Sequence, residues 1–275
     1  MSLNASTAIF GGTAAYNINP ADFADVVETT VLETPYGRSP HFLKLRTAQG
    51  TAVWFSSRHG ENELARSARF VNHRANIWAV RELGANLILF WNGVGAINPA
   101  LRVGQAVVPA AIMDWTRHRI HSFGAEPHPL RQAARTIEHI ENGCLAGSRH
   151  RLPHQTAHPF HEPTRQAILA SIQYSVFSIQ SPVYVCTEGP RLETAAEINL
   201  AAALGADVVG MTLCPEVWLA AELGLRYASL CLITNFATGR WHIDPRRDFG
   251  ASVAERALPI LLDVADRMNG RQGEG

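Results

Sequence analysis

The chain has few of the features that would direct it to nucleic acid or to a membrane. Its 275 residues carry 24 basic and 24 acidic side chains, which give a formal net charge of zero. No overall electrostatic attraction to a polyanion or to an anionic lipid surface is therefore expected. The sequence also lacks an apolar run of about 18 residues and a signal-peptide pattern, which predicts a cytoplasmic protein that binds neither nucleic acid nor membrane.

Patterns typical of metal sites and dinucleotide sites are missing as well. The four cysteines lack the spacing of metal ligands. Two of them, Cys186 and Cys231, lie in apolar runs, as buried and reduced thiols do. No G-x-G-x-x-G motif stands between a first strand and a helix, which argues against a dinucleotide-binding fold. We therefore expect no bound metal.

Short apolar runs alternate with helical patterns along the chain, and 47% of its residues are hydrophobic. This alternation predicts an α/β fold, with a central sheet covered by helices on both faces. The length is at the upper end for one domain, so we expect a single domain over 1–275 with frayed ends at 1–5 and 269–275. Strands are expected within 6–12, 51–60, 86–97 (running into a Gly-rich turn), 105–113, 182–187, 207–211 and 228–234, and helices within 72–83, 164–174, 193–204, 215–223 and 251–268.

Groups suited to an anion follow several of the predicted strands. Four segments supply them: Gly-Gly-Thr at 11–13, Arg-His at 58–59, Asn-Gly-Val-Gly at 92–95 and Gly-Met-Thr at 210–212. Backbone N–H groups at Gly-rich turns, hydroxyl groups and a guanidinium all bind phosphate well. Each segment alone is typical of an ordinary turn or surface loop. Because strand ends converge at one edge of an α/β sheet, the four together indicate an anion site.

Two further polar residues, Glu193 and Asn235, have both a structural and a functional interpretation. Glu193 follows the rigid turn Gly-Pro-Arg-Leu and precedes a predicted helix, where a carboxylate stabilises the helix N-terminus by ~0.3–1 kcal/mol. Asn235 ends a predicted strand, and Asn in this position commonly begins a turn. From the residues alone, the structural interpretation is the more frequent one for each.

The stretch 184–239, which contains GPRLET, GMT and ITN in this order, resembles the purine nucleoside phosphorylase family. The resemblance is to the branch that includes methylthioadenosine and methylthioinosine phosphorylases, and it extends from Ile9 to about Leu262. It implies a single-domain nucleoside phosphorylase fold with a central mixed sheet flanked by helices. It also implies a pentosyltransferase that needs no cofactor and uses inorganic phosphate as a co-substrate. The implied assembly is a homotrimer, in which the irregular segment 118–163 reaches a neighbouring subunit.

The resemblance implies that the anion-binding segments form a phosphate site. One departure concerns Ala14, which stands where relatives carry Gly. Ala disfavours a positive φ, so we expect the loop to follow a different course, and this leaves a nucleosidase with water in place of phosphate as an alternative. The implied phosphate contacts are Thr13, Arg58, His59, Gly93 and Thr212, with Asn92 beside them.

The same resemblance assigns Glu193 and Asn235 to base recognition and, with His59, to the catalytic set. An Asn amide and a Glu carboxylate complement the O6 acceptor and N1–H donor of a 6-oxopurine, whereas adenine presents the opposite pattern. Adenine-specific relatives carry T-D-Y-D where this chain has Thr-Asn-Phe-Ala, so Ala237 offers no second carboxylate. Mispaired buried polar groups reject a near-isostere strongly. The sequence therefore predicts a nucleoside of hypoxanthine or guanine.

Apolar residues are implied around the sugar. Met211 matches a thioether against the ribose, and Leu192 matches a position near base and sugar. The histidine that binds a 5′-hydroxyl in relatives is missing, and Phe249 and Val253 would form an apolar wall there. Such a wall suits a 5′-methylthio group, because burial of a CH₂-sized group gains ~0.8 kcal/mol. His154 roughly matches a residue donated by the adjacent subunit.

These residues together predict phosphorolysis of a 6-oxopurine nucleoside. The first candidate is S-methyl-5′-thioinosine, cleaved to hypoxanthine and 5-methylthioribose 1-phosphate. A methylthioadenosine or general purine nucleoside phosphorylase is the alternative within the family. A nucleosidase and a non-catalytic nucleotide-binding protein on the same scaffold are further alternatives. The joint presence of all the family's polar site residues argues against the non-catalytic one.

Overall fold

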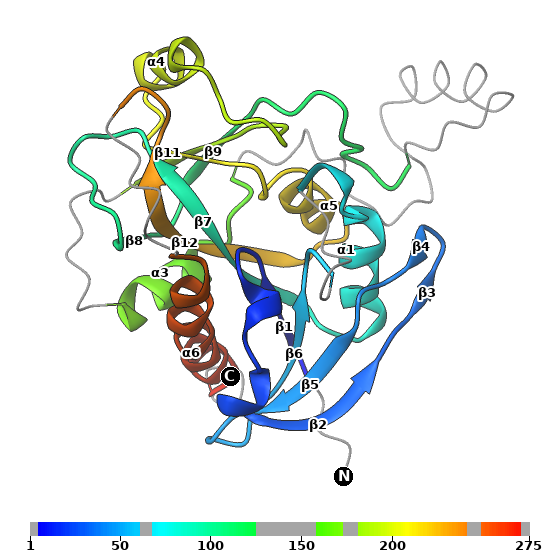
Figure 1. Ribbon diagram of the computed structural model, residues 1–275. Coiled ribbons are helices and arrows are strands. Elements are labelled where there is room, and N and C mark those ends of the chain that lie inside the picture. Colours follow the sequence, from blue (N-terminus) through cyan, green and yellow to red (C-terminus); the bar gives the residue numbers. More distant parts are fainter. Residues whose placement is uncertain (1–4, 61–67, 125–157, 173–180, 241–248, 271–275) are drawn as a thin grey trace, which may run out of the picture.

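The computed structural model describes residues 5–60, 68–124, 158–172, 181–240 and 249–270 (Figure 1). Within these residues a mixed sheet of ten strands forms the centre, in the order β2-β5-β6-β1-β7-β11-β10-β9, with β12 paired to β7 and β8. The predicted α/β class with a central mixed sheet is confirmed. The strands are β1 (Thr7–Gly11), β2 (Asp25–Thr30), β5 (Phe42–Arg46), β6 (Ala52–Ser57), β7 (Leu87–Ala96), β8 (Ala106–Val107), β9 (Ala111–Asp114), β10 (Val183–Cys186), β11 (Val208–Gly210) and β12 (Arg226–Phe236), with β3 (Glu33–Thr34) and β4 (Gly37–Arg38) as a separate pair.

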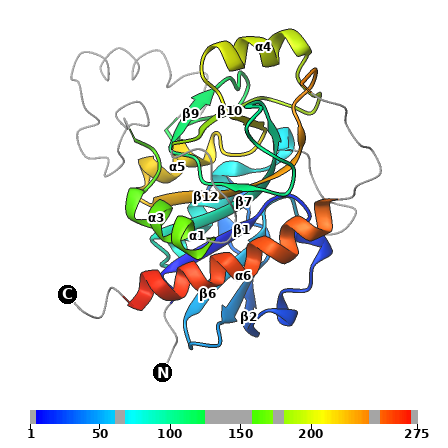
Figure 2. The same ribbon diagram turned by 90° about the vertical axis from the view of Figure 1, so that its left-hand side faces the viewer.

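Helices cover both faces of the sheet, as the alternating pattern predicts. Successive residues of β1 face opposite sides: Phe10 packs in the core cluster with α1 and α5, and Ile9 packs in the cluster with α3 and α6. Figure 2 shows α6 running across one face of the sheet, with α4 at the far end of the molecule. The helices are α1 (His73–Glu82), α3 (Glu162–Ser171), α4 (Ala195–Ala203), α5 (Glu216–Glu222) and α6 (Phe249–Gly270), with 3₁₀ turns at Ala15–Asn17, Pro20–Asp22 and Ala68–Phe70.

The sheet is organised around β7. Its first half, from Leu87 to Trp91, pairs in parallel with β1, whereas Gly95 and Ala96 pair antiparallel with β11. β12 runs parallel along the other edge of β7 over its whole length. The predicted Gly-rich turn at 92–95 is wrong, because pairing with β12 gives these residues the backbone partners that keep them in the strand. Among the described strands, none pairs with residues 92–94 on the edge between β1 and β11.

The two ends of the described chain lie side by side. The Ser6 hydroxyl donates to Asn269 Oδ1 at 2.6 Å, and Ala5 is buried. The described chain therefore begins at residue 5 next to the end of α6, which continues to Gly270, and the extent of the frayed ends stays a prediction. Residues 1–4 and 271–275 lie outside the described part of the chain.

The close approach of the loop after β1 to β7 gives a stability prediction for Gly12→Ala. A Cβ at Gly12 would lie 2.2 Å from the Trp91 carbonyl oxygen and 3.3 Å from Asn92 Cα, which are backbone atoms of the central strand. We expect the substitution to lower the free energy of unfolding by about 1–3 kcal/mol, the usual cost of overpacking. Urea unfolding measures the change. Gly124→Ala is the control, since its Cβ would come no closer than 3.6 Å to Ser122 Oγ; equal losses for both would contradict the steric argument.

Candidate active site

The loop after β1 fills the open edge of β7. Thr13 Oγ1 accepts the Gly93 N–H at 3.0 Å, and so supplies the partner that no described strand gives. A Cβ on Gly93 would lie 3.0 Å from Thr13 Oγ1 and 2.8 Å from Thr234 Cγ2, so a larger residue there would displace one of the two threonine side chains. Ala14 has φ 61°, so the loop takes the left-handed conformation that glycine favours even though residue 14 is Ala. Burial of its methyl group in the core offsets part of the ~1–2 kcal/mol cost of that conformation.

Thr212 lies on the other side of this gap, just after β11. Asn92 Nδ2 donates to Thr212 Oγ1 at 2.7 Å and to the Tyr184 hydroxyl at 3.2 Å. The Thr212 N–H donates to the same hydroxyl at 3.3 Å, and burial raises the pKa of Tyr184 well above its usual value. Asn92 is 0% exposed. Asn92 therefore holds Thr212 from within the protein and has no surface open to a ligand.

Arg58 joins these two sides. Its backbone N–H donates to the Gly11 carbonyl at 2.9 Å, and its Nη1 donates to the Thr212 carbonyl at 2.9 Å. Its Nη2 lies 2.8 Å from His59 Nε2. A guanidinium can only donate, so His59 Nε2 is the acceptor and carries no proton. The predicted segments 11–13, 58–59, 92–95 and 210–212 are thus brought together at one place by direct contacts.

A buried carboxylate and a buried histidine stand behind Arg58. Glu216 Oε1 lies 3.5 Å from Arg58 Nη1 and 2.9 Å from His73 Nδ1. His73 Nε2 lies 3.0 Å from the Ala68 carbonyl oxygen. Burial lowers the pKa of His73, although the hydrogen bond and the charge of Glu216 act in the opposite direction. Glu216 and His73 were not among the predicted site residues.

The two threonine hydroxyls are left as hydrogen-bond donors. Thr13 Oγ1 and Thr212 Oγ1 each accept an N–H, so each hydroxyl still has its own proton to give. The gap between β1 and β11 therefore presents two hydroxyl donors next to the buried positive charge of Arg58. This combination of groups suits a phosphate-sized anion.

Thr187 holds Glu193 in place. The Thr187 hydroxyl donates to Glu193 Oε1 at 2.5 Å. α4 begins two residues later, and its N-terminus is capped by Thr194, whose side chain accepts the Glu197 N–H while Glu197 accepts the Thr194 N–H. The structural role considered for Glu193, stabilising the helix N-terminus, is thus performed by Thr194 and Glu197. The Thr187 hydroxyl was not predicted from the sequence, because Thr in a loop after a strand carries no distinctive signal.

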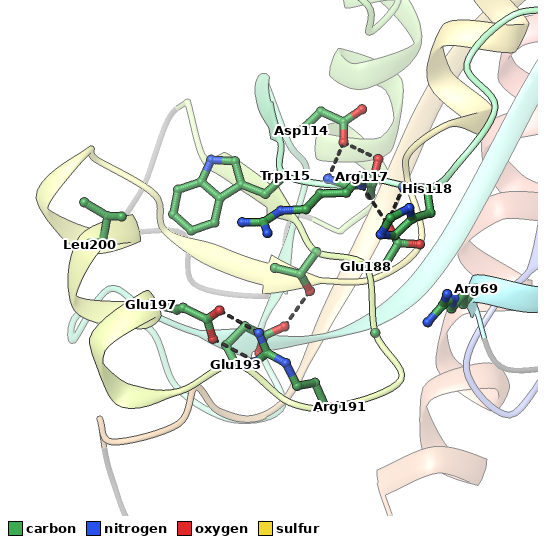
Figure 3. Close-up of a pocket in the computed structure, with 13 residues that line it drawn as sticks. Arg69, Asp114, Trp115, Arg117, His118, Glu188, Arg191, Glu193, Glu197 and Leu200 are labelled. Atoms are coloured by element: carbon green, nitrogen blue, oxygen red, sulfur yellow. Dashed lines mark hydrogen bonds and ion pairs between the residues drawn. The ribbon is translucent and has the colours of Figure 1, made fainter.

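A cavity of about 630 Å³ opens beside Glu193 (Figure 3). This volume lies in the usual range for small-molecule pockets. Charged side chains of both signs line it, among them Arg117, Glu188 and Arg191, the last paired with Glu197 at 2.7 Å. Of the predicted site residues, Glu193 belongs to this lining, whereas the described lining does not include Asn235, Met211 or Thr212.

Asn235 lies on β12, opposite Gly95 of β7. Thr234 Oγ1 donates to Asn235 Oδ1 at 2.8 Å, and Asn235 Nδ2 donates to the Phe236 carbonyl at 2.9 Å. Among the described residues, these two contacts use one of the two N–H groups of the amide, which leaves the other for a ligand. A Cβ on Gly95 would come within 3.3 Å of Asn235 Nδ2, so the glycine leaves room for this side chain.

Glycine residues packed tightly against side chains connect the segments that carry the base and sugar residues. Gly239, just after β12, packs so tightly that a Cβ would lie 2.6 Å from the Ala195 methyl at the start of α4. A Cβ on Gly189 would lie 2.6 Å from Met211 Sδ, so the Met211 side chain rests on the loop that leads to Glu193. The end of β12, the loop after β10 and the loop after β11 are therefore neighbours.

The other predicted substrate residues lie in varied surroundings. Leu192 is 60% exposed, and Ala237 is buried, with its N–H donated to the Ala96 carbonyl at 2.8 Å. Val253 is 4% exposed and packs in the core cluster under α6, so its contact with a ligand stays a prediction. The Phe249 side chain and His154 lie outside the described part of the chain.

The described residues contain neither a metal-binding cluster nor a membrane-spanning helix. No group of three His, Cys, Asp or Glu side chains within them is placed to hold a metal ion. No helix within them combines the length and the apolar character needed to cross a membrane.

Comparison with known proteins identifies the family. Residues 7–266 match the family described as the Phosphorylase superfamily. The chain belongs to this superfamily. It is 37% identical over 236 residues to a probable 6-oxopurine nucleoside phosphorylase of Thermococcus kodakarensis, covering 84% of this chain and 79% of the relative. It is 36% identical over 261 residues to a probable S-methyl-5′-thioinosine phosphorylase of Methanothermobacter thermautotrophicus, covering 94% and 81%.

Solved structures of the superfamily share the fold. A double mutant of adenosine/methylthioadenosine phosphorylase from Schistosoma mansoni, in complex with adenine, superposes with a TM-score of 0.79 at 27% identity. That comparison covers 97% of this chain and 92% of the other. A single mutant of the same enzyme in complex with methylthioadenosine also gives a TM-score of 0.79, at 28% identity over 96% and 92% of the two chains. The predicted family resemblance is confirmed by these findings.

The arrangement predicts that the Thr13 hydroxyl contributes to anion binding by this phosphorylase. Thr13→Val removes the hydroxyl and keeps the shape, so we expect phosphate affinity to fall by about tenfold, the value of one hydrogen bond to a charged group. The measurement is the rise in melting temperature with increasing inorganic phosphate. Thr13→Ser keeps the hydroxyl and should retain most of the effect. Phosphate-dependent stabilisation of Thr13→Val equal to that of wild type would remove Thr13 from the site.

Proposed function

We propose that this phosphorylase cleaves a 6-oxopurine nucleoside with inorganic phosphate, and that S-methyl-5′-thioinosine is its substrate. The observation that carries the proposal is the set of donors at the open edge of β7: the Thr13 and Thr212 hydroxyls beside the Arg58 guanidinium. A phosphate held there would attack the sugar C1′ while that carbon becomes cationic. We propose no metal, no other cofactor and a single catalytic domain.

The proposed reaction needs little covalent chemistry from the protein. The glycosidic bond loosens first and leaves an oxocarbenium-like sugar. The phosphate then closes on C1′ from the opposite face, with inversion, and the purine departs as an anion. Phosphate donors aimed at this developing arrangement stabilise it electrostatically, the effect that usually contributes most to catalysis. His59, as the acceptor of an Arg58 hydrogen bond, keeps the guanidinium in place for this step.

The hydrogen-bond states of Asn235 and Glu193 support a 6-oxopurine over adenine. Asn235 accepts the Thr234 hydroxyl at its oxygen and donates one N–H to the Phe236 carbonyl, so its second N–H offers a donor that suits O6 and N7. Glu193 accepts the Thr187 hydroxyl, and a carboxylate in this state accepts N1–H. Adenine has a lone pair at N1 and a donor at N6, and would meet a mismatch at both positions.

The proposals of a 5′-methylthio group and of a trimeric assembly are supported by relatives of this chain. Relatives of two kinds, one described as acting on 6-oxopurine nucleosides and one on S-methyl-5′-thioinosine, are 37% and 36% identical to this chain. A general 6-oxopurine nucleoside phosphorylase is therefore the second candidate, and a methylthioadenosine phosphorylase the third. We also propose a homotrimer in the cytoplasm, by analogy with the family.

A substrate panel tests the proposed function. We expect base release from methylthioinosine to exceed that from inosine, and both to exceed that from methylthioadenosine, with all activity dependent on inorganic phosphate. The loss of a partner for the 5′-hydroxyl costs inosine about 1–3 kcal/mol, or roughly five- to 150-fold in kcat/KM. The measurement is release of hypoxanthine or adenine with and without phosphate. Turnover that is equal in phosphate-free buffer would favour the nucleosidase alternative instead.

Asn235→Asp tests base recognition. The substitution places a carboxylate against O6 of hypoxanthine and gives adenine N6–H an acceptor. We expect the ratio of kcat/KM for methylthioadenosine to that for methylthioinosine to rise by about 30- to 1,000-fold, which corresponds to roughly 2–4 kcal/mol. The gain should remain partial, because Glu193 still faces the N1 lone pair. An unchanged ratio would show that Asn235 does not touch the base.

A further inference from the structure

Arg119 is a buried cation that donates to backbone carbonyl groups of two loops. It lies in the loop after β9, and its side chain is 2% exposed. Its Nη1 donates to the carbonyl oxygens of Met211 at 2.7 Å and Cys214 at 2.5 Å. Its Nη2 donates to those of Glu188 at 2.6 Å and Thr187 at 3.2 Å. One guanidinium therefore bridges the backbone of two loops that follow different strands, β10 and β11.

Each of these loops carries one half of the site. The loop after β10 holds Thr187, whose hydroxyl fixes Glu193. The loop after β11 holds Thr212, whose carbonyl is the acceptor of Arg58. Arg119 takes the carbonyls on either side of Thr212, at Met211 and Cys214, while Arg58 takes the one between them. Two buried guanidinium groups thus hold the same short turn.

The Glu188 side chain in turn holds the loop that carries Arg119 by accepting hydrogen bonds from its backbone. Its Oε2 accepts the backbone N–H groups of Arg117 at 2.7 Å and His118 at 3.2 Å, and its Oε1 lies 3.5 Å from Arg119 Nε (Figure 3 shows Glu188 beside Arg117 and His118). Partial burial raises the pKa of Glu188, but these N–H groups and the Arg119 charge outweigh it, so the pKa lies below its usual value. The Arg119 side chain therefore holds the backbone at Glu188, and the Glu188 side chain holds the backbone next to Arg119.

We propose that Arg119 is a positioning residue that sets the base-recognition and phosphate-binding loops relative to one another. The proposal rests on the proposed function for the identity of the two ligands. Arg119 bonds to backbone carbonyls of both loops and assists each ligand only through them. Only a planar guanidinium, with its fork of fixed N–H groups, can serve four carbonyls in two directions; an ammonium group cannot.

Arg119→Lys tests the proposal through the Michaelis constants of both substrates. We expect KM for phosphate and KM for the nucleoside each to rise about tenfold. The value of kcat divided by the product of the two KM values then falls by about a hundredfold, the size of effect that a small misplacement of catalytic groups produces. By contrast, Thr187→Val should raise only the nucleoside KM and Thr13→Val only the phosphate KM. Arg165→Lys is the matched control, since Arg165 is buried and paired with Glu162 on α3, away from both loops. An Arg119→Lys enzyme with a lowered melting temperature but wild-type KM values would overturn the proposal.

Direct binding separates this proposal from the proposed function. Calorimetric titration with inorganic phosphate alone and with hypoxanthine alone should show both affinities weakened in Arg119→Lys and unchanged in Arg165→Lys. If Arg119→Lys fails to fold, Glu188→Gln provides the second variant, with a smaller loss of both affinities expected. A wild type that binds both ligands without phosphate-dependent turnover would end the proposed function and leave this test intact. If Arg119→Lys and Glu188→Gln both lost affinity for only one of the two ligands, the proposal that Arg119 positions both loops would be overturned.

Discussion

One N–H of the central strand that no described neighbouring strand pairs explains why the site lies where it does. β7 has β1 beside it up to Trp91 and β11 beside it from Gly95 onward. Between them the half-buried Gly93 N–H needs a partner, since a backbone donor withdrawn from water and left unpaired costs up to about 1–3 kcal/mol. Thr13 Oγ1 provides it, which draws the loop after β1 across the gap. The change of neighbours along β7 therefore creates the opening and selects the hydroxyl that lines it, as expected at a switch point of an α/β sheet.

Backbone carbonyl groups near this opening accept hydrogen bonds from two buried arginine side chains. Arg58 and Arg119 are both nearly inaccessible to water, and a buried charge is costly unless it is paired and hydrogen-bonded. Arg58 donates to one carbonyl of the turn after β11, and Arg119 donates to two others in the same turn. The turn gains three strong hydrogen bonds and loses its freedom to move. The rigidity of the turn thus comes from neutral carbonyl groups that accept hydrogen bonds from both guanidinium groups.

The sequence predicted the pieces of this site better than their connections. Strand ends and the residues on them could be predicted because apolar runs and Gly-rich boundaries are local patterns. The interpretation of 92–95 as a turn failed because pairing with β12, more than 130 residues later, keeps these glycines in a strand. The strands β2 and β5 were not predicted, since β2 is almost wholly exposed and shows no apolar alternation. Arg119, Thr187 and Glu216 were missed because their importance depends on contacts with backbone groups distant in sequence.

The protons carried by the neighbouring His73 and Glu216 explain why Arg58 keeps its positive charge. A carboxylate 3.5 Å from the guanidinium would by itself cancel that charge. His73, however, has Nε2 on the Ala68 carbonyl at 3.0 Å and Nδ1 on Glu216 at 2.9 Å. The carbonyl can only accept, so Nε2 carries a hydrogen, and the contact with Glu216 needs one more proton between the two groups. With that proton the His73–Glu216 pair carries no net charge, although burial acts to lower the pKa of His73 against the hydrogen bond and charge of Glu216. The positive charge of Arg58 is therefore left uncancelled, next to the two hydroxyl donors that face the gap in the sheet.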